Sequence, residues 1–178
     1  MYHFADRNAP MRSFVPGPHS KREFRDALGR FATGVTVVTT TTSEGPVGIT
    51  ANSFASVSLD PPIVLWSIGR QSKRFAAFAE CAQFAVHVLA AEQLDISRRF
   101  ARSGDAFDGL TFDRNDAEIP LLHGCLSRFE CARIADHEGG DHLIVVARVL
   151  NATLRDGEPL LFAGGDYGRF DGFSGPRT

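Results

Sequence analysis

The sequence predicts a mainly β fold of the α+β type: an antiparallel barrel with short peripheral helices. Runs of β-branched and apolar residues typical of strands recur at six or more places. Most of these runs are joined by short turns, which favours antiparallel pairing over a parallel sheet with crossover helices. The glycine-rich loop of a Rossmann unit is also missing, because Gly164, Gly165 and Gly168 follow the last expected strand and precede no helix.

The composition fits one compact domain. The chain has 178 residues, of which 43% are hydrophobic and 22% charged, so it can bury a sizeable core. Fifteen Phe, against two Tyr and one Trp, predict a Phe-rich core or subunit interface. We expect a flexible arm over 1–19, the domain over 20–170 and a flexible tail over 171–178. The net charge of −2 disfavours nucleic acid as a partner.

Several other classes of protein are disfavoured. The three cysteines (Cys81, Cys125 and Cys131) contain no CxxC pair, so neither a zinc site nor a disulfide framework is expected. The six histidines lack HExxH spacing, and we predict no metal. No apolar run approaches the roughly 18 residues that span a bilayer, and the N-terminus lacks the apolar core of a signal peptide. We therefore expect no membrane partner and a soluble, cytoplasmic protein.

The first element is predicted to be a helix that follows the arm. Ser20 and Glu23 have the spacing of a capping box, and Gly34 should end the helix. Its apolar face consists of Phe24, Ala27, Leu28 and Phe31.

The remaining elements are mostly strands. Residues 35–42 and the segment from Val47 onward should form a hairpin around a turn at 43–46. The chain from 104 to 124 and the connection 136–141 are expected to be loops. His87 should face the side of its strand opposite Val86 and Val88. Further strands are expected at 63–68, 84–89, 110–113, 125–135, 142–154 and 159–163, with helices at 73–79 and 91–103.

A polar run follows the second strand of the predicted hairpin. Thr50, Asn52, Ser53, Ser56 and Ser58 fall within nine residues. Short hydroxyl and amide side chains suit a polar ligand bound along a strand edge. They equally suit a turn, because such residues hydrogen-bond their own backbone. Taken alone, this run leaves the two interpretations evenly matched.

The residues Ser72-Lys73-Arg74 open a predicted helix directly after a strand. A helix N-terminus offers free amides and partial positive charge, so this segment could bind a phosphate. The alternative is an N-cap serine followed by two solvated cations. The proximity in sequence of the polar strand edge and of Ser67 and Ile68 favours the ligand interpretation.

Two further segments carry polar side chains that could reach a site. Arg98 and Arg99 are adjacent on a helix and point about 100° apart, so at most one should face a ligand. His142 follows Gly139-Gly140-Asp141 and precedes a buried strand, where it could enter a cleft. On these residues alone an exposed hairpin turn is the favoured interpretation.

Taken together, the ordered segments resemble the short-chain flavin reductase family, the FMN-binding split-barrel reductases of two-component monooxygenases. The resemblance covers roughly residues 24–167. It rests on FATGVTVVT (31–39), GITANSF (48–54), VSLDPPIV (57–64), FAVHVL (84–89), SRRF (97–100) and GDH (140–142).

This resemblance implies an NAD(P)H:flavin oxidoreductase that passes a hydride from NADH or NADPH to FMN or FAD. Reduced flavin would then leave for a partner oxygenase, and the reductase would be a homodimer. His142 would be the catalytic contact to the nicotinamide nucleotide, with Tyr167 as a second NAD(P)H contact. The implied flavin contacts are Thr50, Ala51, Asn52, Ser53, Ser67, Ile68, Ser72, Lys73, Arg74, Phe75, Arg99 and Phe100.

Two alternatives keep the fold and change the activity. The protein could retain its flavin and reduce a bound substrate directly, or it could bind flavin without turnover. The sequence also departs from the family pattern at His87, where Asn is common, and its tail aromatics are only approximately placed.

Overall fold

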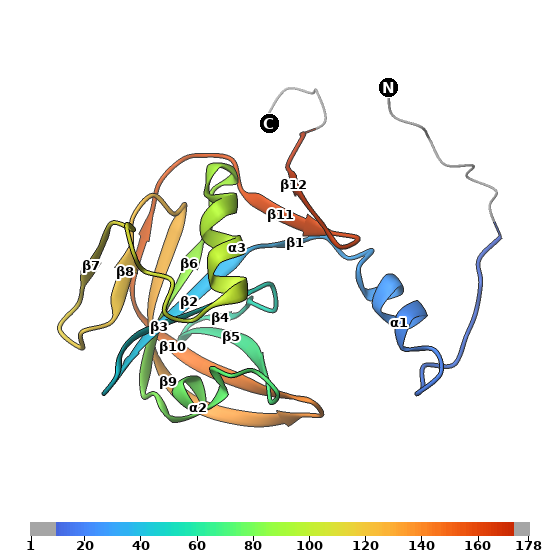
Figure 1. Ribbon diagram of the computed structural model, residues 1–178, viewed down its shortest axis with the longest axis horizontal. Helices are drawn as coiled ribbons and strands as arrows, with labels where there is room; N and C mark the ends of the chain where they lie inside the picture. The colour runs from blue at the N-terminus through green and yellow to red at the C-terminus, as the bar shows by residue number, and fades with distance from the viewer. Residues whose placement is uncertain (1–9, 173–178) are drawn as a thin grey trace.

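A computed structural model describes residues 10–172. Its body is one antiparallel sheet of seven strands in the order β3-β2-β6-β9-β10-β5-β4 (Figure 1). This confirms the predicted mainly β, antiparallel architecture. The strands are β2 (Thr36–Thr42), β3 (Gly45–Ala51), β4 (Ala55–Leu59), β5 (Pro62–Gly69), β6 (Gln83–Val88), β9 (Ser127–Gly139) and β10 (His142–Leu154).

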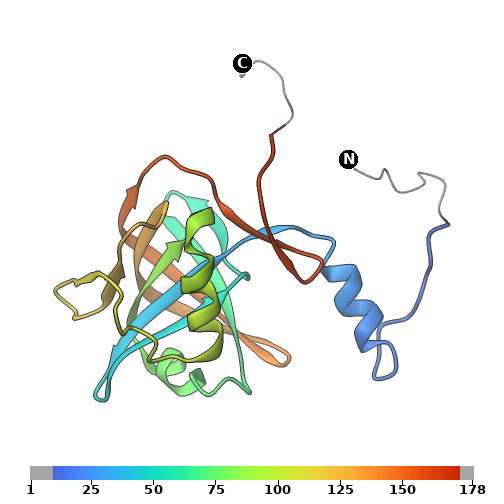
Figure 2. The same ribbon diagram turned by 45° about the horizontal axis from the view of Figure 1, so that its top comes forward.

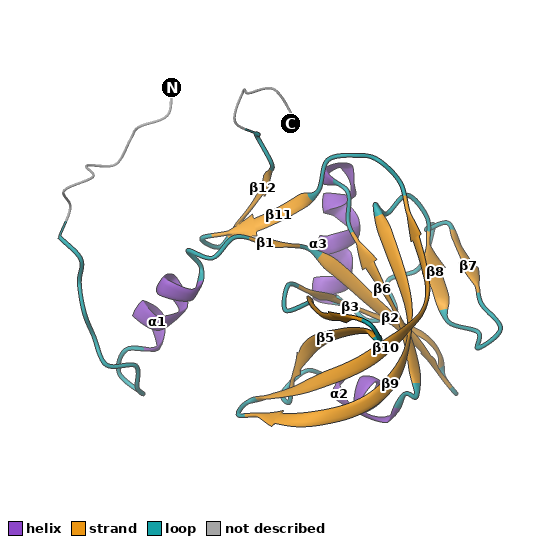
Figure 3. Ribbon diagram, turned by 180° about the vertical axis from the view of Figure 1, so that it is seen from behind, coloured by secondary structure: helices purple, strands orange, loops and turns teal. Residues whose placement is uncertain are grey.

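The sheet curls until its two edges meet. β3 and β4 stand at opposite ends of the strand order, yet only residues 52–54 connect them. So short a connection spans on the order of 10–14 Å, so the two edge strands must lie near one another. No ladder of hydrogen bonds joins β3 to β4. The result is an open, strongly curved sheet, called the barrel below, which is consistent with the predicted split barrel and whose curvature is seen in Figure 3.

Two smaller sheets flank this body. β7 (Phe112–Arg114) and β8 (Pro120–Leu122) form a hairpin, where only a loop with one strand at 110–113 was expected. β1 (Thr33–Gly34), β11 (Leu160–Ala163) and β12 (Asp166–Arg169) form an arm beside the barrel (Figures 1 and 2).

β12 was not predicted. Gly164 and Gly165 have φ angles of 61° and 94°, which a side-chain-bearing residue rarely adopts. They turn the chain back so that β12 pairs with β11. The sequence after Gly164 therefore forms a hairpin, and only 170–172 of the described residues follow it.

The helices are short and peripheral. α3 (Leu94–Arg102), preceded by the 3-10 turn η1 (Ala91–Gln93), lies against β3 and β2 (Figure 1) and confirms the predicted helix at 91–103. α2 (Phe75–Glu80) begins two residues later than predicted. Within residues 10–172, none of the helices has the length and apolar character that a bilayer crossing requires.

The first helix departs from its prediction. α1 (Lys21–Leu28) stops well before Gly34 because Thr33 and Gly34 pair with β11. The expected capping box does not form: the Ser20 hydroxyl donates to Val15 O and accepts from Gly17 N–H. Phe31 lies beyond the helix and is 79% exposed. Figure 1 shows α1 standing away from the barrel.

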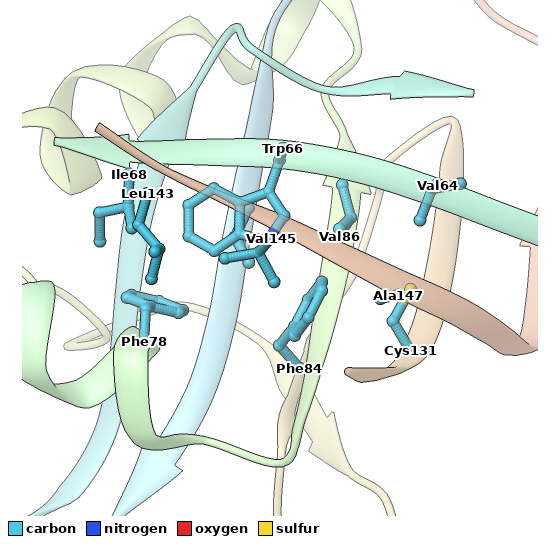
Figure 4. Packing of buried hydrophobic residues seen from close by; sticks show 11 residues of the cluster. Val64, Trp66, Ile68, Phe78, Phe84, Val86, Cys131, Leu143, Val145 and Ala147 are labelled. Atoms are coloured by element: carbon cyan, nitrogen blue, oxygen red, sulfur yellow. The ribbon is translucent and has the colours of Figure 1, made fainter. Parts of the chain in front are cut away.

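The core confirms the predicted role of phenylalanine. In the main cluster, Trp66 packs edge-on against Phe78 and Phe84, with ring centroids 5.2 and 5.9 Å apart (Figure 4). A second cluster lies beneath α3 and includes the buried Phe100 and Phe107. The two clusters hold β5, β10 and α3 in fixed positions relative to one another.

The strand β9 is longer at the hairpin tip than predicted, whereas β10 has the predicted bounds. β9 continues through residues 136–139, so the connection shrinks to Gly140 and Asp141. Gly140 has a φ of 73°, which suits a tight turn between long strands. The prediction for His87 is confirmed: its ring is fully buried on the face opposite Val86 and bonds Val37 O and Leu122 N.

Candidate active site

Ser53 holds the polar edge against the neighbouring strand. Its hydroxyl donates to Ser67 O at 3.0 Å and accepts from Ser67 N–H at 2.9 Å. Both backbone groups of Ser67 are thus satisfied by one side chain, just beyond the point where β4 pairs with β5. The hydroxyl fixes residues 52–54 where the two edges of the sheet meet. Ser53 therefore bonds backbone, as the turn interpretation expected, but across the sheet. The ligand interpretation stays a prediction.

Asn52 lies beside Ser53 and faces a cleft of about 530 Å³. Its side chain is exposed and makes no hydrogen bond to any other residue between 10 and 172. The cleft lies between the barrel edge, the end of α1 and the β11–β12 turn, with Arg30 and Phe162 in its wall. An amide with free donors and acceptors in such a cleft can bind a polar heterocycle.

Thr50 belongs to a hydrogen-bonded group that joins three elements. Its hydroxyl donates to Ser97 O at 2.7 Å, which ties β3 to α3. The Ser97 and Tyr167 hydroxyls lie 2.9 Å apart and are hydrogen-bonded, which ties α3 to β12. The Tyr167 ring also packs on Phe162, with centroids 5.2 Å apart. Tyr167 is therefore half-buried, and its hydroxyl is already engaged with α3.

The turn after β5 contains Ser72, Lys73 and Arg74, the residues predicted to bind a phosphate. Ser72 accepts a hydrogen bond from Arg74 N–H, while Lys73 is exposed and pairs with no described carboxylate. Arg74 reaches α3 and donates to Ala101 O. Partial burial lowers the pKa of Arg74, and Asp105 raises it.

A second cleft, of about 540 Å³, adjoins this turn. Its lining includes the cations of Lys73, Arg74 and Arg102 and also the carboxylates of Glu44, Glu80 and Asp105. The cleft is therefore mixed in charge rather than uniformly basic. Phe75, the first residue of α2, packs under the Arg70 guanidinium, which is 5.5 Å from the ring centroid.

His142 lies directly over Gly69. A Cβ at Gly69 would be 3.4 Å from His142 Nε2, so the imidazole lies in contact distance of this position. His142 Nδ1 donates to Asp141 Oδ1 at 2.7 Å. This hydrogen bond and the imidazole charge lower the pKa of Asp141. Arg70 secures the hairpin tip, since its N–H donates to Asp141 O and its guanidinium pairs with Glu138.

The sheet register aligns these two groups. His142 pairs with Gly69 and Ile144 with Ser67. Alternate residues of a strand point to the same face, so Ser67, Gly69 and His142 share one face of the β5–β10 pair. Ile68 points the other way and is buried in the main core. Of Ile68, only the backbone is available to a ligand on this face.

The remaining predicted contacts have packing roles in the structure. Phe100 is fully buried against Phe107, with centroids 4.9 Å apart. Arg99 donates to Asp108 O, while its neighbour Arg98 is exposed. Ala51 is half-buried against the main core. Within residues 10–172, the structure contains no cluster of His, Cys, Asp and Glu that could hold a metal.

Sequence reasoning missed three contributors to this region. Ser97 is buried between Thr50 and Tyr167, and a serine inside an amphipathic helix gives little signal in one sequence. Arg30 reaches the cleft from the segment expected to be helical, and Phe162 from the last strand. Their approach to Asn52 depends on the β1–β11 pairing, which is non-local.

The family model for the flavin reductase like domain matches residues 28–171. An FMN reductase (NADH), SmoA, of Agrobacterium fabrum is 59% identical over 157 residues, which cover 88% of this chain and 90% of the relative. The flavin-dependent monooxygenase reductase subunit HsaB of Rhodococcus jostii is 40% identical over 148 residues, covering 82% and 76%.

Solved structures agree with the family match. The NADH:FAD oxidoreductase SgcE6 of Streptomyces globisporus, in complex with NAD and FAD fragments, superposes with a TM-score of 0.84 at 38% identity. The superposition covers 92% of this chain and all of that one. Family model, relatives and fold therefore agree over nearly the whole chain, which belongs to the flavin reductase-like family.

Proposed function

We propose that this chain is an NADH-dependent flavin reductase that passes a hydride to FMN or FAD and supplies reduced flavin to a partner monooxygenase. One observation carries the proposal. Ser67, which is bonded to Ser53, lies on the same face of the β5–β10 pair as His142. The chain that carries this arrangement matches an NADH-dependent reductase of similar length. The Agrobacterium relative is named for FMN and the Streptomyces structure for FAD, so both flavins remain in the proposal.

Residues 50–53 would bind the flavin ring and ribityl chain. Ser53 fixes this segment through Ser67, and the free amide of Asn52 supplies directional donors and acceptors. The Thr50 hydroxyl donates its hydrogen bond to Ser97 O, so its oxygen remains available as an acceptor. Ala51 contributes backbone groups. A preformed polar edge of this kind orients a ligand without a large ordering cost.

The turn from Ser72 to Phe75 would hold the flavin phosphate. Lys73 has no carboxylate partner among the described residues, and the amides at the start of α2 add donors. Ser67 and the Ile68 backbone lie between this turn and the polar edge. Phe100 would contribute by seating α3 against Gly48, and Arg99 by holding the loop at Asp108.

His142 would contact the nicotinamide nucleotide. Because Nδ1 donates to Asp141, Nε2 is the ring nitrogen left to contact a ligand. Bound flavin supplies the hydride acceptor, so the protein has only to orient the two rings and exclude water. Tyr167 would contact the nucleotide through its ring, since its hydroxyl bonds Ser97.

The functional unit is proposed to be a cytoplasmic homodimer. Phe24, Leu28 and Phe31 are exposed on and after α1, and the cleft at Asn52 opens beside them. Apolar groups so exposed on a projecting element favour burial against a second copy. The three cysteines are free thiols, which suits a reducing compartment.

The proposal is tested by steady-state kinetics with FMN and FAD, each with NADH and NADPH. We expect flavin-dependent NADH oxidation. His142→Ala should lower kcat/KM for NADH about tenfold or more, because a positioned contact is lost, while flavin KM stays unchanged. His137→Ala, an exposed histidine on the same hairpin, is the matched control. Absence of turnover with both flavins would refute the activity.

A further inference from the structure

A basic pocket lies at the opposite end of the β9–β10 ribbon from His142. It has a volume of about 390 Å³ and is formed by the turn between β8 and β9 and by the end of β10. Arg128 pairs with Thr153 there, whereas His142 pairs with Gly139 at the other end of the same 13-residue strands. The pocket is therefore separate from the candidate active site.

The charges in this pocket are unbalanced. Its lining contains Arg128, Arg155 and His123 and no Asp or Glu. Arg155 is compensated from outside the pocket, since it donates to Glu92 at 2.8 Å and to Gly124 O. His123 donates to Asp113 at 2.8 Å. Among residues 10–172, Arg128 alone of these three has no ion pair.

Arg128 is also only partly exposed, and its Nε is buried without a hydrogen-bond acceptor. Arg133, on the same strand, also has a buried Nε without an acceptor, but its other nitrogens bond Phe78 O, Ala79 O and Asp136. No such partner among the described residues satisfies Arg128. A partly buried guanidinium without an acceptor is unfavourable, and a bound anion would satisfy it.

Cys125 shows that the two arginines converge. Cys125 lines the pocket together with both arginines, and its thiol donates to Leu122 O at 3.5 Å. Burial raises the pKa of Cys125, while Arg128 and Arg155 both act to lower it. Both guanidinium groups are therefore near enough to Cys125 to favour negative charge at that point. The Thr153 hydroxyl, also in the lining, is a further donor.

We propose that this pocket binds a small oxyanion, a phosphate or carboxylate group, between Arg128 and Arg155. The planar fork of Arg128 would bind two of its oxygens, and Arg155, already fixed by Glu92, would add charge. This site does not depend on the proposed reductase activity.

Alkylation of Cys125 tests the proposal in the full-length protein. Iodoacetamide is neutral, and mass spectrometry of peptides reports Cys125 and Cys81 separately. Inorganic phosphate is varied at ionic strength held constant with KCl. At phosphate about ten times its dissociation constant, the rate at Cys125 should fall about tenfold by occupancy. The rate at Cys81, which lies near Arg133, should not change.

Three variants make the test specific to Arg128. Arg128→Gln should abolish protection, whereas Arg98→Gln, an exposed arginine on α3, should leave it intact. Arg128→Lys keeps the charge but loses the fork, so protection should weaken, and this variant serves if the glutamine variant fails to fold. A parallel acetate series distinguishes carboxylate from phosphate. Failure of both anions to protect Cys125, or equal protection in the Arg128 variants, would overturn the proposal.

Discussion

Ser53 shows how a hydroxyl in a polar run can join two strands of the sheet. Its hydroxyl bonds the backbone of Ser67, as a turn-forming serine would bond its neighbours, but its partner is a strand 14 residues away. The sequence could predict that residues 50–53 are special because hydroxyl and amide groups cluster there. It could not predict the Ser67 contact, since that depends on the sheet curling until its edges meet.

Ser53→Ala should raise the flavin KM and lower stability. The substitution leaves both backbone groups of Ser67 without their partner, which costs about 1–3 kcal/mol, and it releases Asn52. Ser56→Ala, at an exposed position on β4, is the control and should change neither quantity. Flavin titration and urea unfolding measure the two effects. Equal behaviour of the two variants would contradict the role given to Ser53.

His87 should make stability depend on pH. Burial lowers the pKa of His87 from 6.5 to about 4. The hydrogen bond to Val37 O and the charge of Glu130 raise this pKa, and the charge of Arg128 lowers it further. As the pH falls, the His87 imidazole binds a proton in the unfolded chain before it does so in the folded one. The free energy of unfolding therefore falls as the pH drops from 6.5 to about 4. The difference between these two pKa values corresponds to roughly 3 kcal/mol in the free energy of unfolding.

Thermal unfolding across this pH range measures the effect of His87. His87→Gln keeps a donor and an acceptor without a titrating ring, so its stability should depend less on pH. Parallel curves for the two proteins would show that another group governs acid unfolding.

At the scale of elements, the sequence pattern predicted those helices and strands that local residues determine. The strands β2, β3, β5, β6, β10 and β11 and the helix α3 follow from apolar periodicity and are confirmed. α1 and β12 were misjudged because pairing with β11 decides both: it ends the helical segment before Thr33 and recruits the glycine-rich tail. The apolar periodicity through Phe31 favours a longer helix, but the non-local pairing with β11 outweighs it.

Gly48→Ala should disrupt the seat of α3 on β3. A Cβ at Gly48 would lie 2.5 Å from Phe100 Cε1, inside a closely packed cluster. Overpacking of this kind costs about 1–3 kcal/mol and should also displace Thr50 from Ser97. Gly168→Ala, on β12, has no atom within 4 Å of its new Cβ and is the control. Unchanged unfolding of the Gly48 variant would show that α3 can shift without cost.

At the scale of the whole molecule, the fold class and the family could be predicted from ordered motifs along the chain. The clefts could not, because each is lined by segments far apart in sequence. The cleft at Asn52 joins residues near 30, 52 and 163, and the cleft at Lys73 joins residues near 44, 74 and 103. Such groupings depend on sheet order, which one sequence does not specify.

The proposed dimer should depend on the projecting helix. Leu28→Ser and Phe31→Ser together remove apolar surface that is 59% and 79% exposed in the single chain. We expect light scattering to show a shift from dimer to monomer at low micromolar concentration. Leu154→Ser, at a position that is 84% exposed at the end of β10, should leave the dimer intact. A monomeric parent protein would contradict the dimer itself.

The most direct measurement of the central proposal is an anaerobic single turnover with NADH and FMN or FAD. The near-ultraviolet absorbance of NADH and the visible absorbance of the flavin are followed together. The proposed function predicts that both fall at the same rate and in equal molar amounts, and that His142→Ala slows both. Oxidation of NADH without bleaching of the flavin, or no oxidation with either flavin, would contradict it.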